Sequence, residues 1–262
     1  DLTLPFDFND IGQVETLFKE NKGEIAGVII EPALHEEPND GYLKELKDLT
    51  HENEAVLIFD EVWTGFRWDL GGAQKYYGVE PDISAFGKAM GNGVPISSIV
   101  GNKEVMSEMN TEVFFSSTFG GECLGLAASK ATISEIKNKN VTGHIKDLNK
   151  KLKAGYNDIC IDFSIDEYTK CEGPEARVFQ SFTHENLDTN EMKSIIQQEL
   201  FKNGVLWKGY HGTSFSHNNQ DVDETIEGFK FGLEKLKKAI KEGNVAKYIE
   251  GDPIGSVFRS YP

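Results

Sequence analysis

The chain has 262 residues, of which 39% are hydrophobic and 27% are charged. This composition is ordinary for a globular protein with a buried core, and it argues against a disordered chain. Acidic residues outnumber basic ones by 43 to 27, which gives a formal net charge of −16. Because this charge repels polyanions, nucleic acid and anionic membranes are excluded as main partners, and small molecules are favoured.

The cysteines indicate the redox compartment of the protein, and the first residue indicates whether the sequence is a piece of a longer one. Cys123, Cys160 and Cys171 are widely spaced and form no CxxC pair. They indicate free thiols in a reducing compartment, the cytoplasm, rather than a structural metal site. No apolar run reaches the length of a membrane span, and no signal peptide is visible. Residue 1 is Asp rather than Met, so we expect a preceding part to be missing.

The first sixty residues alternate between helical and strand patterns. Residues 11–22 carry apolar side chains at helical spacing, and residues 25–32 form a β-branched run that ends in proline. Residues 41–55 are amphipathic, and residues 55–60 (AVLIFD) form a second apolar run. Strands that are apolar on both faces are typical of parallel sheets, so the sequence predicts an α/β fold: a mostly parallel sheet with helices on both faces.

The pattern changes near residue 141. Short apolar runs at 175–182 and 204–208 predict strands, and an acidic amphipathic stretch at 221–243 predicts a helix. The sequence therefore predicts two domains. Residues 1–140 would carry the parallel sheet, and residues 141–262 would form a small C-terminal α+β domain.

Two carboxylates, Asp60 and Glu61, end the second apolar run, where ligands of doubly wound sheets bind. A nucleoside triphosphatase would need an earlier GxxxxGK[ST] loop, but the only Gly-Lys pair, Gly87-Lys88, comes later and lacks that pattern. A dinucleotide site is weaker still, because GNGVPI lacks the third glycine and an acidic partner. Asp60 and Lys88 together offer what pyridoxal phosphate (PLP) chemistry needs, a carboxylate for a protonated ring nitrogen and an amine for an imine.

Four other polar residues are interpreted as structural. Glu61 is expected to form a local salt bridge or cap, and Glu31, before Pro32, is interpreted as a strand-end carboxylate of structural use. His211 and His217 share one segment, but no third ligand is spaced near them, so no metal site is predicted.

Four motifs give the chain a specific resemblance. LIFDEVWTGFR, GGAQKYYGVEPDI, GKAMGNGVPIS and SSTFGG, in this order, resemble the class III aminotransferases, closest to the glutamate-1-semialdehyde 2,1-aminomutase group. The similarity covers nearly the whole chain. It implies a fold-type I PLP-dependent transferase, in which residues 1–140 are the C-terminal part of the large PLP-binding domain.

The resemblance also implies roles for four residues. Asp60 would pair with the pyridine nitrogen, Lys88 would form the internal aldimine, and Val62 would pack on one ring face. Thr118 would bind the cofactor phosphate in the neighbouring subunit's site, which implies a homodimer with shared active sites. The reaction would move an amino group between a small-molecule donor and acceptor, or within one substrate in an aminomutase.

Departures from the family pattern leave the substrate open. Trp63 stands where members acting on ω-amino acids carry Gln, whereas the aminomutase group has an apolar residue there. Glu122 and Cys123 replace an Asn-Pro pair of that group. The family's N-terminal segment is also not visible, which implies a truncated piece or a companion chain. The alternative function is therefore a catalytically incomplete fragment or assembly partner that retains the fold.

Overall fold

The structure is a computed structural model, and it describes residues 2–33, 35–111 and 113–255. The chain divides into two compact units, Asp1–Thr142 and Gly143–Pro262. None of the helices in the described ranges is long and apolar enough to cross a membrane.

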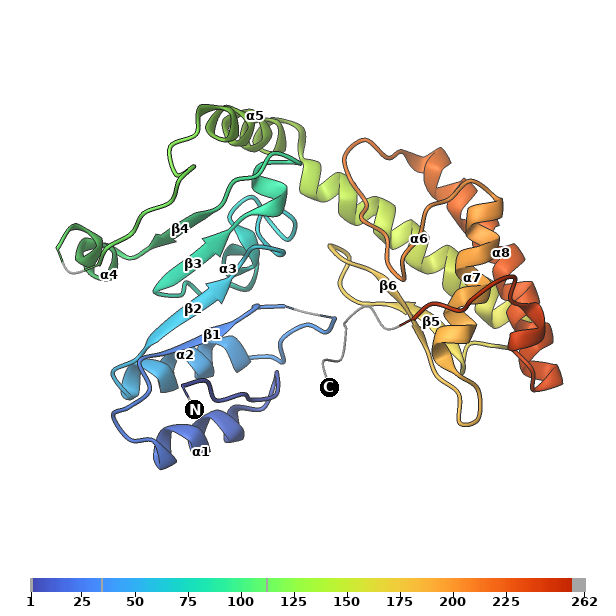
Figure 1. The fold of residues 1–262 in the computed structure, drawn as a ribbon, viewed down its shortest axis with the longest axis horizontal. Coiled ribbons are helices and arrows are strands. Elements are labelled where there is room, and N and C mark those ends of the chain that lie inside the picture. The colour runs from blue at the N-terminus through green and yellow to red at the C-terminus, as the bar shows by residue number, and fades with distance from the viewer. Residues whose placement is uncertain (1, 34, 112, 256–262) are drawn as a thin grey trace. The chain divides into compact units, whose positions relative to one another are not determined.

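A four-stranded sheet forms the centre of the first unit (Figure 1). Its strands lie in chain order: β1 (Gly27–Ile30), β2 (Val56–Asp60), β3 (Ile83–Phe86) and β4 (Ser98–Gly101). The first three strands are parallel, and β4 is antiparallel to β3. The predicted mostly parallel sheet is therefore confirmed.

Two amphipathic helices pack with this sheet into one apolar core. They are α1 (Ile11–Glu20) and α2 (Tyr42–Glu52). Asp10 caps α1 by accepting a hydrogen bond from the Gln13 amide at 3.0 Å. The buried core residues that the helices and strands share are Val14, Phe18, Val28, Ile30, Tyr42, Leu43, Leu46, Ala55, Leu57 and Phe59.

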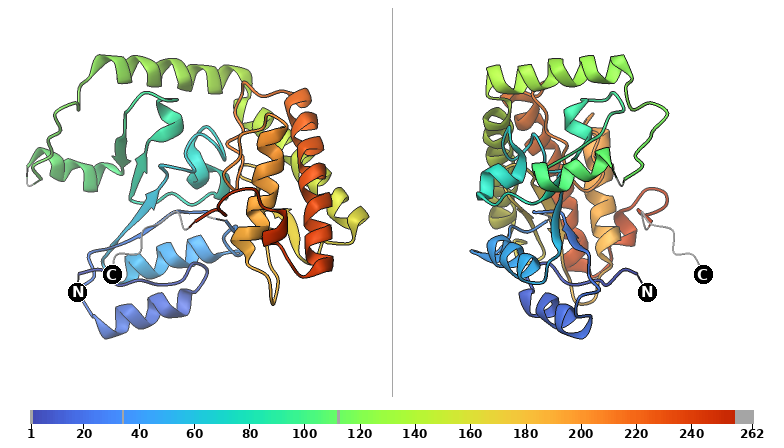
Figure 2. Two further views of the ribbon diagram at one scale, coloured as in Figure 1. Left: turned by 45° about the vertical axis from the view of Figure 1, so that its right-hand side comes forward. Right: turned by 90° about the vertical axis from the view of Figure 1, so that its left-hand side faces the viewer.

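Shorter elements connect and follow the strands. They are α3 (Gly72–Tyr77), the 3₁₀ turn η1 (Lys88–Met90), α4 (Lys103–Ser107), the 3₁₀ turn η2 (Glu108–Asn110) and α5 (Cys123–Lys139). Figure 2 shows the residues that lead into α5, from 113 to 122, as a loop. After α5, Asn140 takes a left-handed conformation with φ of 48°, which separates α5 from the next helix.

The second unit packs helices against a two-stranded antiparallel sheet. Its elements are α6 (Val141–Phe163, which begins at the unit boundary), β5 (Thr169–Glu172), β6 (Phe179–Phe182), α7 (Thr189–Lys202), α8 (Asn219–Glu242) and the 3₁₀ turn η3 (Ala246–Tyr248). Its core holds the rings of Tyr156, Trp207 and Phe229. Cys160 and Cys171 are buried there as free thiols, and burial raises the pKa of each to about 12.

One strand prediction is wrong and one strand was missed. Residues 204–208 form no strand, although β6 lies within the predicted run at 175–182. Trp207 is buried as a core side chain; its indole N–H donates to Gln180 Oε1 at 3.0 Å, and its carbonyl accepts from Gln197 Nε2 at 2.9 Å. The Trp207 carbonyl, which would bond to a neighbouring strand in a sheet, is instead paired with the Gln197 side chain. The partner of β6 is β5, whose sequence TKCE has no apolar alternation.

Asp82 ties the beginnings of β2 and β3 together. Its Oδ2 accepts from the Leu57 amide at 2.7 Å and lies 2.9 Å from His51 Nε2, while Oδ1 accepts from Asn102 Nδ2 at 3.1 Å. Burial raises the pKa of Asp82, but the hydrogen bonds from Leu57 and His51 outweigh burial and hold this pKa below its usual value.

Asp82→Asn is expected to lower the free energy of unfolding by about 1–2 kcal/mol at neutral pH. Because the folded-state pKa is depressed, the stabilisation is full above the unfolded-state value, about 3.9, and is lost as pH falls through the folded-state value. Urea unfolding at several pH values should therefore show that the free energies of unfolding of Asp82→Asn and of the unmodified chain become equal below about pH 4. A difference in the free energy of unfolding that stays constant down to acid pH would contradict the stabilising role of the ionised Asp82 carboxylate.

Candidate active site

Three sequence-predicted polar residues follow neighbouring parallel strands. Glu31 comes directly after β1, Asp60 ends β2, and Lys88 comes shortly after β3. In the β2–β3 ladder Asp60 pairs with Ala85. Figure 1 shows β2 and β3 side by side; since parallel strands end at the same edge of a sheet, the residues that end β2 and follow β3 belong to one edge, which is where doubly wound sheets bind ligands.

Asp60 is half-buried and held by its own turn. Its Oδ1 accepts a hydrogen bond from the Val62 amide at 2.9 Å. Within the described part of the chain no other hydrogen bond reaches this carboxylate, so Oδ2 remains open to a ligand.

Lys88 lies in a strained and tightly closed loop. Its φ is 42°, in the left-handed region that costs a non-glycine residue roughly 1–2 kcal/mol. The Met90 amide donates to the Gly87 carbonyl at 2.9 Å, and the Gly91 amide donates to the Lys88 carbonyl at 3.1 Å. The Lys88 side chain is exposed. A rigid loop that presents an exposed amine from a strained backbone has the form of a functional site.

Val62 lies beside this loop. A Cβ built on Gly87 would come within 3.6 Å of Val62 Cγ1 and of the Ile96 carbonyl oxygen, which places the valine side chain against the residue before Lys88. Val62 thus lies against the loop that carries Lys88, and it directly follows the turn that begins at Asp60.

Thr118 follows much later in the chain, after β4 and α4. It lies in a turn before α5 with an exposed side chain, and in the ranges that the structure describes it makes no side-chain hydrogen bond. Its loop also exposes Phe114, Phe115 and Phe119, by 94%, 62% and 77%.

Aromatic residues continue the turn after Val62. The Arg67 guanidinium carbon lies 5.1 Å from the centre of the Trp63 ring, a cation–π contact, and Trp63 meets Trp68 edge-on with ring centres 6.3 Å apart. Trp63, which stands where some class III members carry Gln, is therefore part of an aromatic stack next to the site.

Sequence reasoning missed how Glu61 is used. Its side chain is fully buried and accepts hydrogen bonds from the amides of Ala73 and Gln74, at 2.9 and 2.8 Å, and from the Thr64 hydroxyl. The signal in the sequence was a carboxylate directly after a buried strand, but its two backbone partners, twelve and thirteen residues away, carry no pattern.

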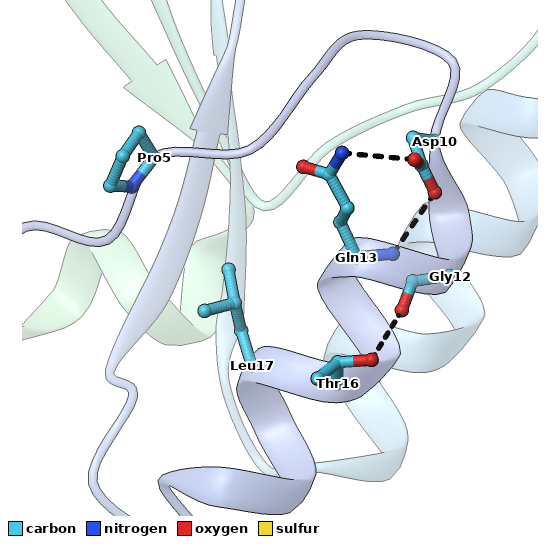
Figure 3. Close-up of a pocket in the computed structure, with 6 residues that line it drawn as sticks. All are labelled: Pro5, Asp10, Gly12, Gln13, Thr16 and Leu17. Atoms are coloured by element: carbon cyan, nitrogen blue, oxygen red, sulfur yellow. Dashed lines mark hydrogen bonds between the residues drawn. The ribbon is translucent and has the colours of Figure 1, made fainter.

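The structure also has a surface hollow that holds none of the predicted site residues. It has a volume of about 400 Å³ and lies beside α1, lined by Pro5, Asp10, Gly12, Gln13, Thr16 and Leu17 (Figure 3). Asp10 already caps the helix there. Across the described ranges no group of three or more His, Cys, Asp or Glu side chains could hold a metal ion.

Comparisons with solved structures show the fold. An omega-transaminase from Sphaerobacter thermophilus superposes with a TM-score of 0.80 at 22% identity, covering 88% of this chain and 57% of that one. A glutamate-1-semialdehyde aminomutase from Pseudomonas aeruginosa superposes with a TM-score of 0.76 at 23% identity, covering 88% and 56%. These likenesses confirm the predicted fold-type I architecture.

Comparisons of sequence show the family. The chain is 35% identical over 254 residues to the glutamate-1-semialdehyde 2,1-aminomutase of Archaeoglobus fulgidus, covering 88% of this chain and 58% of the relative. It is 30% identical over 244 residues to the 3-aminobutyryl-CoA aminotransferase of Cloacimonas acidaminovorans, covering 90% and 58%. The chain thus spans less than two thirds of the length of these relatives. A family model, "Aminotransferase class-III", matches residues 8–166, and the chain therefore belongs to the class III aminotransferase family.

Proposed function

We propose that the chain carries the catalytic residues of a PLP-dependent enzyme that transfers amino groups between small molecules, as an aminotransferase or as a glutamate-1-semialdehyde 2,1-aminomutase. The observation that carries this proposal is the placement of Asp60 and Lys88 at the ends of adjacent parallel strands. Family membership supports it, and relatives with both activities in their names leave both reactions open.

The residues at this edge fit pyridoxal phosphate. The open carboxylate oxygen of Asp60 suits a protonated ring nitrogen, and the exposed amine of Lys88 suits the aldehyde carbon. Val62 offers an apolar contact for one face of the ring. Thr118 is not part of this set: before the N-terminus of α5, where a phosphate is favoured, its hydroxyl would serve the cofactor of the neighbouring subunit's site.

Each residue then has a definite task. When bound, PLP supplies an electron sink for the carbanion that forms at the substrate carbon. Asp60 would accept a hydrogen bond from the ring nitrogen and so favour its protonated form. Lys88 would hold the cofactor through Nζ, and the same amine, when free, would take a proton from the substrate carbon and return it to a neighbouring carbon. Val62 would pack on one face of the ring.

Turnover of glutamate-1-semialdehyde tests this proposal and separates its two forms. The folded chain is incubated with PLP and either this substrate alone or an amino donor with a keto acceptor. Turnover without an acceptor supports the aminomutase, and turnover only with an acceptor supports the aminotransferase. Absence of both reactions in a folded chain that has bound PLP would contradict the proposal.

A homodimer with shared active sites is proposed as the assembly. The exposed phenylalanines of the Thr118 loop support it, because monomers rarely expose so large an apolar patch. Analytical ultracentrifugation should give a mass twice that of the 29.2 kDa chain, and the mass of a single chain would contradict the dimer.

The domain assignment and the location are proposals too. The two compact units support assigning residues 1–140 to the C-terminal part of the PLP-binding domain and 141–262 to the small domain. The three free thiols support a cytoplasmic location.

One observation favours the alternative, a catalytically incomplete chain or assembly partner. Within the described residues β1 pairs only with β2, and Ile29 on β1 is 62% exposed beside a hollow of about 760 Å³. A folded chain that is inactive alone, but gains turnover with a second polypeptide carrying the remaining length of its relatives, would favour this alternative.

A further inference from the structure

Glu61 is a fully buried carboxylate within the turn that follows β2. Both of its oxygens accept hydrogen bonds: Oε2 from the Thr64 hydroxyl and the Ala73 amide, and Oε1 from the Gln74 amide. A buried carboxylate is costly unless its oxygens are paired in this way. Glu61 is therefore built into the turn, next to the residue proposed to face the ring nitrogen.

The two amides belong to the first turn of α3, which has no side-chain cap of its own. Glu61 thus takes the place of a cap from twelve residues away. The chain also closes tightly on this carboxylate, because Gly72 has a φ of 80° and a Cβ there would lie 2.6 Å from Glu61 Oε1. The hydrogen bonds fix Glu61 against α3.

This fixed residue is coupled to Asp60 through the backbone. The Gly65 amide donates to the Glu61 carbonyl at 2.8 Å, so Glu61 is held at both its side chain and its main chain. The amide of the next residue, Val62, is the group that donates to Asp60 Oδ1. The turn that Glu61 anchors therefore carries the only hydrogen bond that orients the Asp60 carboxylate in the described part of the chain.

We propose that Glu61 is a positioning residue that fixes the direction of the Asp60 carboxylate and so holds the proton on the ring nitrogen of the cofactor. The proposal rests on the function proposed for Asp60 and Lys88. Glutamine cannot replace Glu61, because it has one acceptor oxygen for three donors and its NH₂ group would face a donor.

Glu61→Gln tests the proposal against a matched control, Asp82→Asn. Both changes remove a carboxylate that accepts from backbone amides, but Asp82 lies at the opposite end of β2 and β3. PLP affinity is measured by titration of the apo protein. The pH midpoint at which the ring nitrogen of bound PLP loses its proton is measured by absorption spectroscopy. For Glu61→Gln we expect affinity to fall about tenfold and this pH midpoint to fall by about one unit. For Asp82→Asn we expect both to stay within about twofold and about 0.3 unit, whatever its loss of stability.

Equal pH midpoints in the Glu61→Gln variant and the unmodified chain would overturn the proposal. If Glu61→Gln does not fold, Thr64→Val, which removes one donor and keeps both amide bonds, must move the midpoint in the same direction, and an unmoved midpoint again overturns the proposal. Borohydride trapping of PLP on Lys88 in the unmodified chain distinguishes failure of the proposed function from failure of this inference. No trapping contradicts the proposed function. Trapping together with an unchanged pH midpoint in Glu61→Gln contradicts the role of Glu61 alone.

Discussion

Replacing Lys88 with alanine is expected to abolish amino transfer, with turnover falling by roughly 10³-fold or more. The amine that holds the cofactor and moves the substrate proton is lost, and its strained loop offers no second amine at that position. The measurement is the initial rate with saturating donor, acceptor and PLP. Lys103→Ala is the matched control, because Lys103 is an exposed lysine at the first position of α4 in the same unit, and its rate should be unchanged.

Comparing two substitutions at Lys88 checks the backbone geometry behind this result. With a φ of 42°, glycine suits the position better than alanine does. Lys88→Gly should therefore be about 1 kcal/mol more stable to urea than Lys88→Ala, while both are inactive. A residual rate above about 10% of the parent rate in either variant would remove Lys88 from the proposed chemistry.

Gly91→Ala is expected to lower the free energy of unfolding by about 2 kcal/mol or more and to misplace Lys88. A Cβ at Gly91 would lie 2.2 Å from the Val94 carbonyl oxygen and 2.7 Å from Ile96 Cγ2, so the backbone itself would have to move. The Gly91 amide closes the Lys88 loop, and the displaced loop should lose PLP affinity as well as stability.

Gly121→Ala is the matched control for this effect. A Cβ at Gly121 would meet nothing within 4 Å, and Gly121 lies in the same unit. Its free energy of unfolding should stay within about 0.5 kcal/mol of the parent. Equal stability of the two variants would contradict the tight loop around Lys88.

The sequence predicted the first unit well because its strands are apolar on both faces and end in polar residues. Such runs predict a parallel sheet, and ligands of doubly wound sheets bind at the carboxyl ends of the strands, so Asp60 and Lys88 could be proposed as a functional pair from the sequence. Thr118 could not be placed in this way, because it lies in an exposed loop whose hydrogen bonds are local ones, such as that from the Gly120 amide to the Ser117 carbonyl.

The failures came where long-range side-chain contacts decide the structure. The run at 204–208 has the composition of a strand, yet Trp207 fills the core of the second unit and its polar groups bond to Gln180 and Gln197. In β5 (TKCE) Thr169 and Cys171 are buried in alternation with Lys170 and Glu172, but a run of four residues with a single apolar side chain is too short to be recognised from sequence. Glu61 was assigned a local role; it does accept from the nearby Thr64 hydroxyl, but it also accepts from the Ala73 and Gln74 amides of α3, and these two contacts appear only in the folded chain.

Borohydride trapping tests the central claim most directly. The purified chain is mixed with pyridoxal phosphate, reduced and digested, and the modified peptide is located by mass spectrometry. The account predicts a pyridoxyl label on Lys88 that is absent from Lys88→Ala and retained in Lys103→Ala. A folded chain that gives no label on Lys88, or that gives the same scattered labelling of surface lysines with and without Lys88, would contradict it.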